Sequence, residues 1–305
     1  MNTKNLRELL FYGGVKAEVY HDCLPEIRRE NRERLLFFLS GGIFFLLLSM
    51  VASALLKTLS GGFAAYLAAL GICIGLLYAV QGFPDRHAVT AACTDLFMTA
   101  IYLLGIYLDT LAAPTERAYT FPVFIVVLPI LFPRPAVWNI LHTVLYEALF
   151  VTAVLVWKDP SVYSADLLSA LIFGLMSCVL STYSIKVFIT SIVSRRKLQR
   201  IAEMDLNTQI PNRNAYENRM HEYPLRCSNI LSCVYADVNG LHELNNTSGH
   251  DAGDGLLQTV AQEFVQVFER EDCYRIGGDE FVAFVVDKDP REVRQMIRTF
   301  VENVE

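Results

Sequence analysis

The stretch CYRIGGDEFVAFVV, residues 273–286, has the pattern of a β-hairpin. Its two flanking runs, CYRI and FVAFVV, are mostly apolar and rich in the aromatic and β-branched side chains that favour strands. Between them, Gly277 and Gly278 free the backbone for a tight turn. The stretch therefore predicts two antiparallel strands with Asp279 and Glu280 between them.

The residues on either side of this hairpin predict a mixed α+β domain. Residues 230–236 form an apolar, β-branched run that ends in Asp237, and residues 255–268 are apolar at helical spacing. A carboxylate at a strand end and two more at a hairpin tip are oxygen ligands of the kind that Mg²⁺ prefers. Solvated turns also carry Asp and Glu routinely, so from these residues alone a plain surface turn remains open.

The combination of motifs resembles the GGDEF domain of bacterial diguanylate cyclases. The hairpin carries the naming signature as RIGGDEF, residues 275–281. Further matches follow the order of the family: DLNTQIPNR at residues 205–213, DVNGL at 237–241, Asn245, and GHDAGD at 249–254. The resemblance implies an α+β fold similar to the nucleotide-cyclase palm over residues 205–305. It also implies that the family domain continues beyond Glu305, so its C-terminal part is expected to be missing.

The resemblance implies that two GTP molecules are joined into cyclic di-GMP, one on each half of a GGDEF homodimer. Asp237, Asp279 and the Val238 carbonyl would hold Mg²⁺ or Mn²⁺. Asp279 would also be the catalytic proton acceptor, with Glu280 as a supporting catalytic carboxylate. The expected substrate-binding residues are Asn245 and Asp254 at the guanine edge, His250 lining the nucleotide pocket, and His242 at the phosphates.

Several positions depart from the family pattern. His242 stands where the family usually has a phosphate-binding Lys, and Asn246 replaces an Asp. In the segment 205–213, Asn207 and Gln209 replace Leu and Gly. These departures leave a second interpretation open, a catalytically degenerate GGDEF domain that acts as a GTP-binding or interaction module.

Two further expectations concern feedback and capping. The product-inhibition motif RxxD would begin at Phe268 and end at Glu271, so this feedback site is expected to be absent. His250 and Asp254 have an alternative role, the capping of a helix that begins at residues 253–255.

The composition of the whole chain predicts a membrane protein. Hydrophobic residues make up 53% of the 305 residues, and charged residues only 19%. Residues 1–197 hold 16 Lys and Arg against 13 Asp and Glu, whereas residues 198–305 hold 10 against 19. The acidic C-terminal region argues against nucleic acid as a partner, because phosphate binding needs a basic surface. The seven cysteines include no CxxC pair, so neither a disulfide framework nor a zinc site is indicated.

Hydropathy predicts an all-α membrane region of about six spans over residues 35–192, since a span needs roughly 20 apolar residues. The expected spans are residues 35–56, 61–83, 88–108, 119–132, 136–157 and 167–185. The connecting loops carry about one basic residue each, namely Lys57, Arg86, Arg117, Arg134 and Lys158. Both flanks of the region are richer in Lys and Arg, which places both termini in the cytoplasm of a bacterium, with the protein in the inner membrane. Residues 1–34 are then a cytoplasmic segment.

Three ionisable residues fall inside the apolar runs: Asp95, His142 and Glu147. Such groups should face the bundle interior or a watery cavity as a ligand or proton site, or bond to neighbouring Thr and Tyr side chains. A transporter would use them as well, but the sequence has no detectable internal repeat. Residues 193–204 carry an apolar stripe at helical spacing, which predicts a signalling helix that pairs in a dimer or packs on its own domain.

Overall fold

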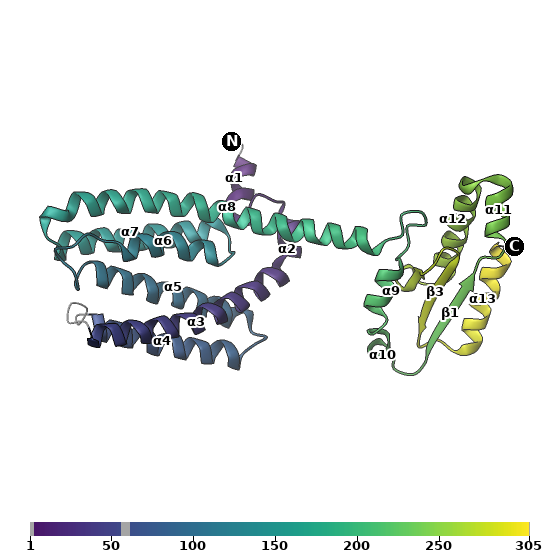
Figure 1. Ribbon diagram of the computed structural model, residues 1–305, viewed down its shortest axis with the longest axis horizontal. Helices are drawn as coiled ribbons and strands as arrows, with labels where there is room; N and C mark the ends of the chain where they lie inside the picture. Colours follow the sequence, from purple (N-terminus) through teal and green to yellow (C-terminus); the bar gives the residue numbers. More distant parts are fainter. Residues whose placement is uncertain (1–2, 56–61, 305) are drawn as a thin grey trace. The chain divides into compact units, whose positions relative to one another are not determined.

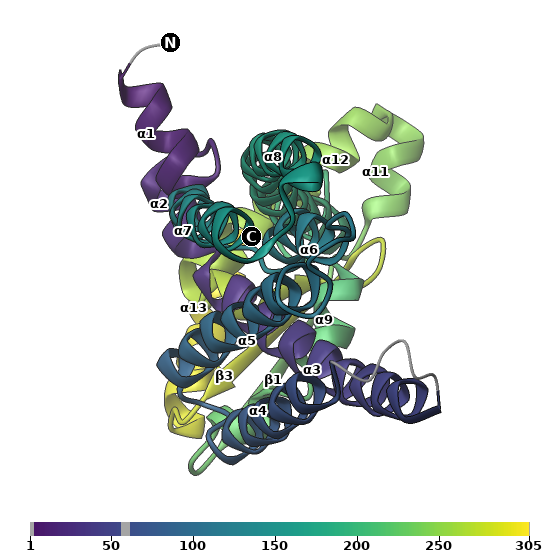
Figure 2. The same cartoon turned by 90° about the vertical axis from the view of Figure 1, so that its left-hand side faces the viewer.

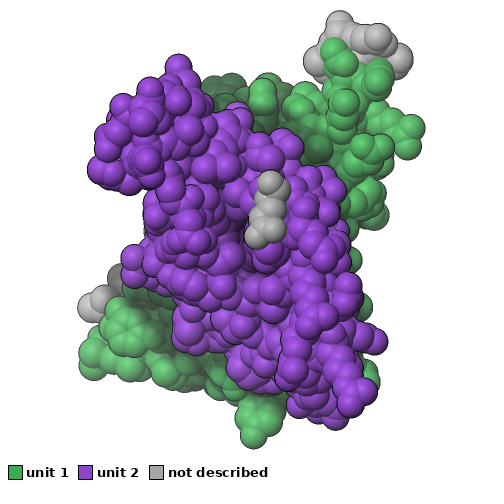
Figure 3. Space-filling model, turned by 90° about the vertical axis from the view of Figure 1, so that its right-hand side faces the viewer, with its two compact units in different colours: residues 1–193 green, residues 194–305 purple. Residues whose placement is uncertain are grey.

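The computed structural model describes residues 3–55 and 62–304 and divides into two compact units, Met1–Val193 and Ser194–Glu305 (Figure 3). Leu56, Lys57 and Gly61, which belong to the predicted first two spans and their loop, lie outside the described residues. Each unit has its own hydrophobic core, so each is described by itself.

The first unit is helical throughout its described residues, and α3 to α8 lie side by side in Figures 1 and 2. Its elements are α1 (Thr3–Tyr12), α2 (Ala17–Asp22), α3 (Leu24–Leu55), α4 (Phe63–Gly82), α5 (His87–Asp109), α6 (Thr120–Leu131), α7 (Ala136–Trp157), the 3-10 turn η2 (Pro160–Val162) and α8 (Tyr163–Glu203).

Within the described ranges, five helices are long and apolar enough to cross a membrane: α3, α4, α5, α7 and α8. The predicted fourth span is the shorter helix α6, which has 12 residues and contains Pro129. At 1.5 Å per residue it would be about 18 Å long, less than the roughly 30 Å of a bilayer core. Length and composition therefore support five spans, and the predicted count of six rests on α6.

The outward faces of these helices are apolar, as the buried ones are. Phe37, Phe45 and Val179 are 72%, 65% and 67% exposed, whereas Phe121 and Phe150 stack at 4.5 Å between ring centroids in the core. Exposed apolar surface of this extent is unfavourable in water. Such a surface is compatible with a membrane protein.

A buried ion pair ties the loop before α6 to the start of α8. Lys158 Nζ lies 2.5 Å from Asp166 Oδ2, and both side chains are almost fully buried. The same ammonium donates to the Glu116 carbonyl at 2.6 Å, and the Ala118 amide donates to Asp166 Oδ1 at 2.9 Å. These bonds satisfy polar groups that would otherwise be costly to bury.

The predicted side-chain bonds of Asp95 to neighbouring Thr or Tyr are wrong. Asp95 Oδ1 instead accepts from Arg134 Nη1 at 2.5 Å, because Arg134, from the loop between α6 and α7, reaches across to α5. The hydroxyl of Thr94 bonds to the Thr90 carbonyl in its own helix. For Glu147, both carboxylate oxygens are buried without a hydrogen-bond partner among the described residues.

The second unit is an α+β domain with a small antiparallel sheet in the order β1-β3-β2. Its elements are α9 (Arg213–Arg219), α10 (Tyr223–Arg226), β1 (Leu231–Asp237), α11 (Leu241–Ser248), α12 (His250–Val267), the 3-10 turn η3 (Arg270–Asp272), β2 (Cys273–Arg275), β3 (Glu280–Val286) and α13 (Pro290–Val304). Strands β2 and β3 pair in antiparallel orientation, which confirms the predicted hairpin.

Helices cover both faces of this sheet, because side chains alternate along each strand. Phe281, Ala283 and Val285 of β3 pack in one cluster with α12 and α13. Phe284 belongs to the opposite cluster, where its ring lies 4.1 Å from that of Tyr223 of α10. Strands β2 and β3 are therefore mostly buried between two layers, whereas β1 is largely exposed.

The prediction of a helix beginning near Gly255 is wrong by one turn and a half. Helix α12 begins at His250, after Gly249 with φ +87°. Residues 250–254 show no apolar spacing because His250, Asp251 and Asp254 are exposed polar residues and the buried residue among the five is Gly253. Asp254 therefore lies inside the helix, and neither it nor His250 is the N-terminal capping residue.

Asp287, the residue that follows β3, holds the segment between α10 and β1 in place. Its carboxylate accepts backbone amides from Ser228 (3.0 Å), Asn229 (2.7 Å) and Ile230 (3.2 Å). These bonds, that from Ser228 foremost, lower the pKa of Asp287 from 3.8 to about 2. Because the folded state favours the ionised carboxylate, these bonds contribute their full stabilisation to the folded domain at pH values above the pKa that Asp287 has in the unfolded chain.

We expect Asp287 to make the C-terminal unit acid-sensitive between pH 4 and pH 2. The stabilisation is lost as the pH falls through this window, since the unfolded chain takes up a proton that the folded carboxylate refuses. Asp287→Asn should weaken protection of β1 and β3 at neutral pH and flatten its dependence on acid. Hydrogen exchange of those strands, corrected for intrinsic rates, measures both, and Asp251→Asn on exposed α12 surface is the control. Equal acid dependence in both variants would contradict the expectation.

Candidate functional site

The end of β1 and the hairpin turn lie together at one end of the sheet. In the strand register Asp237 pairs with Glu280, and the Val238 amide donates to the Asp279 carbonyl at 3.1 Å. The Ile276 amide closes the turn on the Glu280 carbonyl at 2.9 Å. Tertiary pairing thus brings together the two segments that hold the predicted metal ligands.

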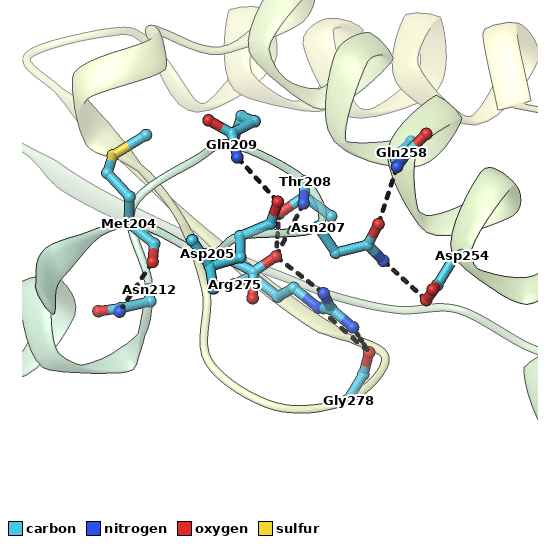
Figure 4. Close-up of polar contacts among 11 residues, drawn as sticks. Met204, Asp205, Asn207, Thr208, Gln209, Asn212, Asp254, Gln258, Arg275 and Gly278 are labelled. Atoms are coloured by element: carbon cyan, nitrogen blue, oxygen red, sulfur yellow. Dashed lines mark hydrogen bonds and ion pairs between the residues drawn. The ribbon is translucent and has the colours of Figure 1, made fainter. Parts of the chain in front are cut away.

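The side chain of Arg275 holds the hairpin turn in place (Figure 4). Its guanidinium donates to the Gly278 carbonyl from Nη2 at 2.6 Å and from Nε at 3.2 Å, and from Nη1 to Asp205 Oδ1 at 2.8 Å. Asp205 also accepts from the amide and hydroxyl of Thr208, at 2.9 and 2.7 Å. Burial would raise the pKa of Asp205, but the bonds from Thr208 and Arg275 outweigh it and lower the pKa. The sequence showed Arg275 and Asp205 only as motif letters; their pairing positions the turn.

Asn245 on α11 points at Gly253 of α12. A Cβ at Gly253 would collide with Asn245 Oδ1, so the close approach of the two helices requires glycine there. That oxygen is buried and has no hydrogen-bond partner among the described residues. A buried acceptor without a donor is costly, and a ligand N–H would satisfy it.

Asp254, which was predicted to bind the guanine edge together with Asn245, is bonded by Asn207, a residue that departs from the family pattern. Asn207 Nδ2 donates to Asp254 Oδ1 at 2.9 Å, and Asn207 Oδ1 accepts from Gln258 Nε2 at 2.9 Å (Figure 4). Asp254 and Asn207 are 47 residues apart, which is why local sequence reasoning missed the pair. One carboxylate oxygen of Asp254 is therefore oriented from the segment 205–213.

His242 and Asn246, two further departures, contact each other one turn apart on α11. Asn246 Nδ2 donates to His242 Nδ1 at 3.0 Å. Both side chains are exposed, as is His250 at the first residue of α12. The His242 and Asn246 substitutions thus form a local pair in place of the Lys and Asp of the family.

Comparison with known proteins identifies this unit. Residues 202–305 match the family model described as diguanylate cyclase, GGDEF domain. Residues 202–305 are a GGDEF domain. Among curated relatives, the cyclic di-GMP phosphodiesterase PdeB of Shewanella oneidensis is 30% identical over 36% of this chain and 13% of its own length. A diguanylate cyclase of Vibrio cholerae is 31% identical over 34% of each chain.

A solved structure also matches, the diguanylate cyclase SiaD of Pseudomonas aeruginosa in complex with its activator SiaC. It is 18% identical with a TM-score of 0.32, over 55% of this chain and 68% of that chain. The matched region spans only 13% of the length of PdeB and 34% of the length of the Vibrio cholerae relative. The family match, over residues 202–305, lies within the C-terminal unit.

Within the GGDEF domain, Glu280 is engaged by a strand residue that sequence reasoning missed. The Tyr235 hydroxyl donates to Glu280 Oε1, and this bond raises the pKa of Tyr235 to about 12. The other oxygen of Glu280 lies against Gly277, where a Cβ would collide with it. Glu280 is thus held back along β1 and supports the turn.

The donor set at the sheet end suits a hard cation, although no group of three or more His, Cys, Asp or Glu side chains in the described residues is placed to hold a metal. The predicted set is smaller, two carboxylates (Asp237 and Asp279) and the Val238 carbonyl. Mg²⁺ is bound in this way when water and phosphates supply the remaining ligands. The residues fit the ion, and their role remains a prediction.

Phe268, at the first position expected for the feedback motif, is a core residue. It is 2% exposed and packs on Phe264, with ring centroids 4.9 Å apart. An apolar ring in the core cannot supply the charge-assisted bonds by which an arginine grips a phosphate. In the described residues, this position is used for packing.

Gln209 carries strain where the family has glycine. Its φ is +57°, a conformation that costs an L residue roughly 1 kcal/mol. The strain persists because neighbouring bonds hold the turn: the Gln209 carbonyl accepts from Arg270 Nη2 at 2.7 Å, and its side chain donates to the Leu206 carbonyl at 2.8 Å.

We expect Gln209→Gly to be more stable than Gln209→Ala by about 1 kcal/mol. Both variants lose the side-chain bond to Leu206, so the difference isolates the positive φ. Pulse proteolysis of the full chain in urea, read on fragments of the GGDEF domain, measures it. If the two variants unfold at the same urea concentration, the turn is not strained at this residue.

Proposed function

We propose that this protein is a membrane-anchored diguanylate cyclase that condenses two GTP into cyclic di-GMP in a GGDEF homodimer. The observation that carries the proposal is the pairing of Asp237 and Val238 with Asp279 and Glu280 at one end of the sheet. The family match over residues 202–305 supports it.

Guanine recognition falls to Asn245 and Asp254 in this proposal. The unpartnered Asn245 oxygen accepts an N–H of the base. Asp254 suits the paired N1–H and N2–H₂ donors, with Asn207 orienting its carboxylate. His250 lines the nucleotide pocket, and His242 lies toward the phosphates.

The chemistry belongs to the sheet end. Asp237, Asp279 and the Val238 carbonyl would hold Mg²⁺ or Mn²⁺, which, when bound, neutralises phosphate charge and favours ionisation of a nearby hydroxyl. Asp279 accepts the proton of the ribose 3′-hydroxyl as this oxygen attacks the α-phosphorus of the GTP on the partner domain. The α–β phosphoanhydride bond of that GTP breaks and pyrophosphate leaves. Glu280, held by Tyr235, supports the turn that carries Asp279.

In this proposal, the first unit anchors the enzyme in the bacterial inner membrane. Its five long apolar helices and the shorter α6 form the anchoring or sensing region over residues 35–192, in contact with lipid. Residues 1–34 and the GGDEF domain, from residue 205, face the cytosol and its GTP. Residues 193–204, the last turns of α8, form the signalling helix that connects them.

The alternative is a GGDEF domain that binds GTP or a partner without turnover. The pairing of His242 with Asn246 favours it, because a neutral imidazole grips phosphate less well than a lysine ammonium.

Asp279→Asn should reduce formation of cyclic di-GMP by about 100-fold or more, because a positioned proton acceptor contributes that much to the rate. Asn245→Ala should mainly raise KM, by about tenfold, since it removes a contact shared by ground and transition states. Chromatography of the product from the full chain in lipid nanodiscs measures both. The control is Asp251→Asn, because Asp251 is an exposed residue of α12. This variant should behave as wild type. If wild-type protein binds Mg-GTP yet makes no product at any protein concentration, the cyclase proposal fails and the GTP-binding module without turnover takes its place.

The topology gives a separate expectation. Cytosolic reporters fused after residues 33 and 200 should both be active, because the basic flanks remain inside. A periplasmic reporter should be active after residue 112, in the loop between α5 and α6. An external signal from either of the first two fusions would contradict the six-span arrangement.

A further inference from the structure

A cavity of about 340 Å³ opens in the first unit, among α3, α5, α7 and the loop that joins α6 to α7. Its volume lies in the range of small-molecule sites. The residues that bear on its chemistry are Arg28, Asn31, Asp95, Arg134, Trp138 and His142. The sequence singled out Asp95 and His142, and the proposed cyclase chemistry uses neither.

Arg134 is the centre of this site. Its side chain is only 13% exposed. The guanidinium donates to Asp95 at 2.5 Å, while Nη2 lies 2.6 Å from His142 Nδ1 and Nε donates to Asn139. Of its five N–H groups, these contacts engage three, so two remain for a ligand. A buried guanidinium locked in one orientation is suited to a carboxylate, which it can bind with two hydrogen bonds.

The charge of the cavity is positive. Asp95 is already paired with Arg134, and Arg28 lines the same cavity with no acidic partner among the residues that the structure describes. An added anion would therefore be attracted by Arg28 and would complete the surroundings of Arg134. A cation would meet only a carboxylate that is already neutralised.

Asn31 adds a requirement for a donor. Its Nδ2 donates to the Pro133 carbonyl at 2.8 Å, which fixes the orientation of the amide. Its Oδ1 is buried and has no hydrogen-bond partner within the described ranges. Buried acceptors are normally paired, so an occupant with an O–H or N–H would satisfy it.

The remaining wall is formed by the exposed aromatic ring of Trp138, by His87 and by the small side chains of Thr90, Ala91 and Thr94. We propose that this cavity binds a small ring-containing carboxylic acid that carries a hydroxyl or amino donor. The carboxylate pairs with Arg134 and Arg28, the donor reaches Asn31, and the ring lies against the indole ring of this wall. The proposal uses no residue of the GGDEF domain, so it stands or falls independently of cyclase activity.

Trp138 is a reporter inside the site. The chain has two tryptophans, and Trp157 is at the far end of α7. In Trp157→Phe protein, held in phosphatidylcholine nanodiscs, Trp138 fluorescence is followed while 4-hydroxyphenylacetate is added. A saturable change is expected, with a Kd of about 1 mM or below. The matched alcohol 4-hydroxyphenylethanol, which lacks the carboxylate, should bind at least about tenfold more weakly.

Variants separate the site from general effects. Arg134→Gln and Arg28→Gln should each weaken binding of the acid about tenfold. Arg28 is exposed and makes few contacts, so its variant keeps the test valid if Arg134→Gln misfolds. The control is Arg29→Gln, which removes an equal charge one residue away, where the side chain is 74% exposed and faces Glu33 at 3.7 Å.

Several outcomes would overturn the proposal. These are no saturation by the acid up to about 10 mM, equal binding of the alcohol, or unchanged binding in Arg28→Gln. Nanodiscs that contain phosphatidylglycerol distinguish a lipid headgroup from a soluble acid. If the anionic lipid alone changes Trp138 fluorescence and abolishes the response to the acid, the occupant is the headgroup and the soluble-ligand proposal fails.

Discussion

The guanidinium of Arg275 is the contact on which the GGDEF domain depends most. The guanidinium joins the Gly278 carbonyl in the hairpin turn to the carboxylate of Asp205. The backbone amide of Arg275 also donates to the Pro211 carbonyl at 2.8 Å. Charge-assisted bonds of this kind are about twice as strong as neutral ones. One side chain thus holds the turn bearing Asp279 against the segment 205–213.

The same segment is fastened to the last turn of α8. The Asn212 amide donates to the Glu203 carbonyl at 2.8 Å, and Arg219 of α9 bonds to the Glu203 carboxylate at 3.0 Å. A displacement of this helix end would therefore be felt at Asp205, and through Arg275 at the turn. This is a continuous set of polar contacts along which a signalling helix can act, within the C-terminal unit alone.

The departures from the family pattern are not scattered. Asn207 bonds to Asp254, and His242 bonds to Asn246, so these substitutions make specific contacts. Gln209 is the exception, because it takes a backbone conformation suited to glycine and is held there by its neighbours. The proposed site is therefore a variant arrangement of polar side chains around an unchanged pair of strand ends.

The sequence by itself determined what depends on near neighbours. The apolar runs predicted the long helices, and the glycine pair between β-branched runs predicted the hairpin. Boundaries were weaker, since the polar first turn of α12 and the short, proline-containing α6 lack clear periodicity. Tertiary structure alone decided the partners of the site residues. Asp95 meets Arg134 across 39 residues, Tyr235 meets Glu280 across 45, and Asn207 meets Asp254 across 47. Propensity and periodicity act over a few residues, whereas these contacts arise only when packed helices and paired strands bring distant backbones together.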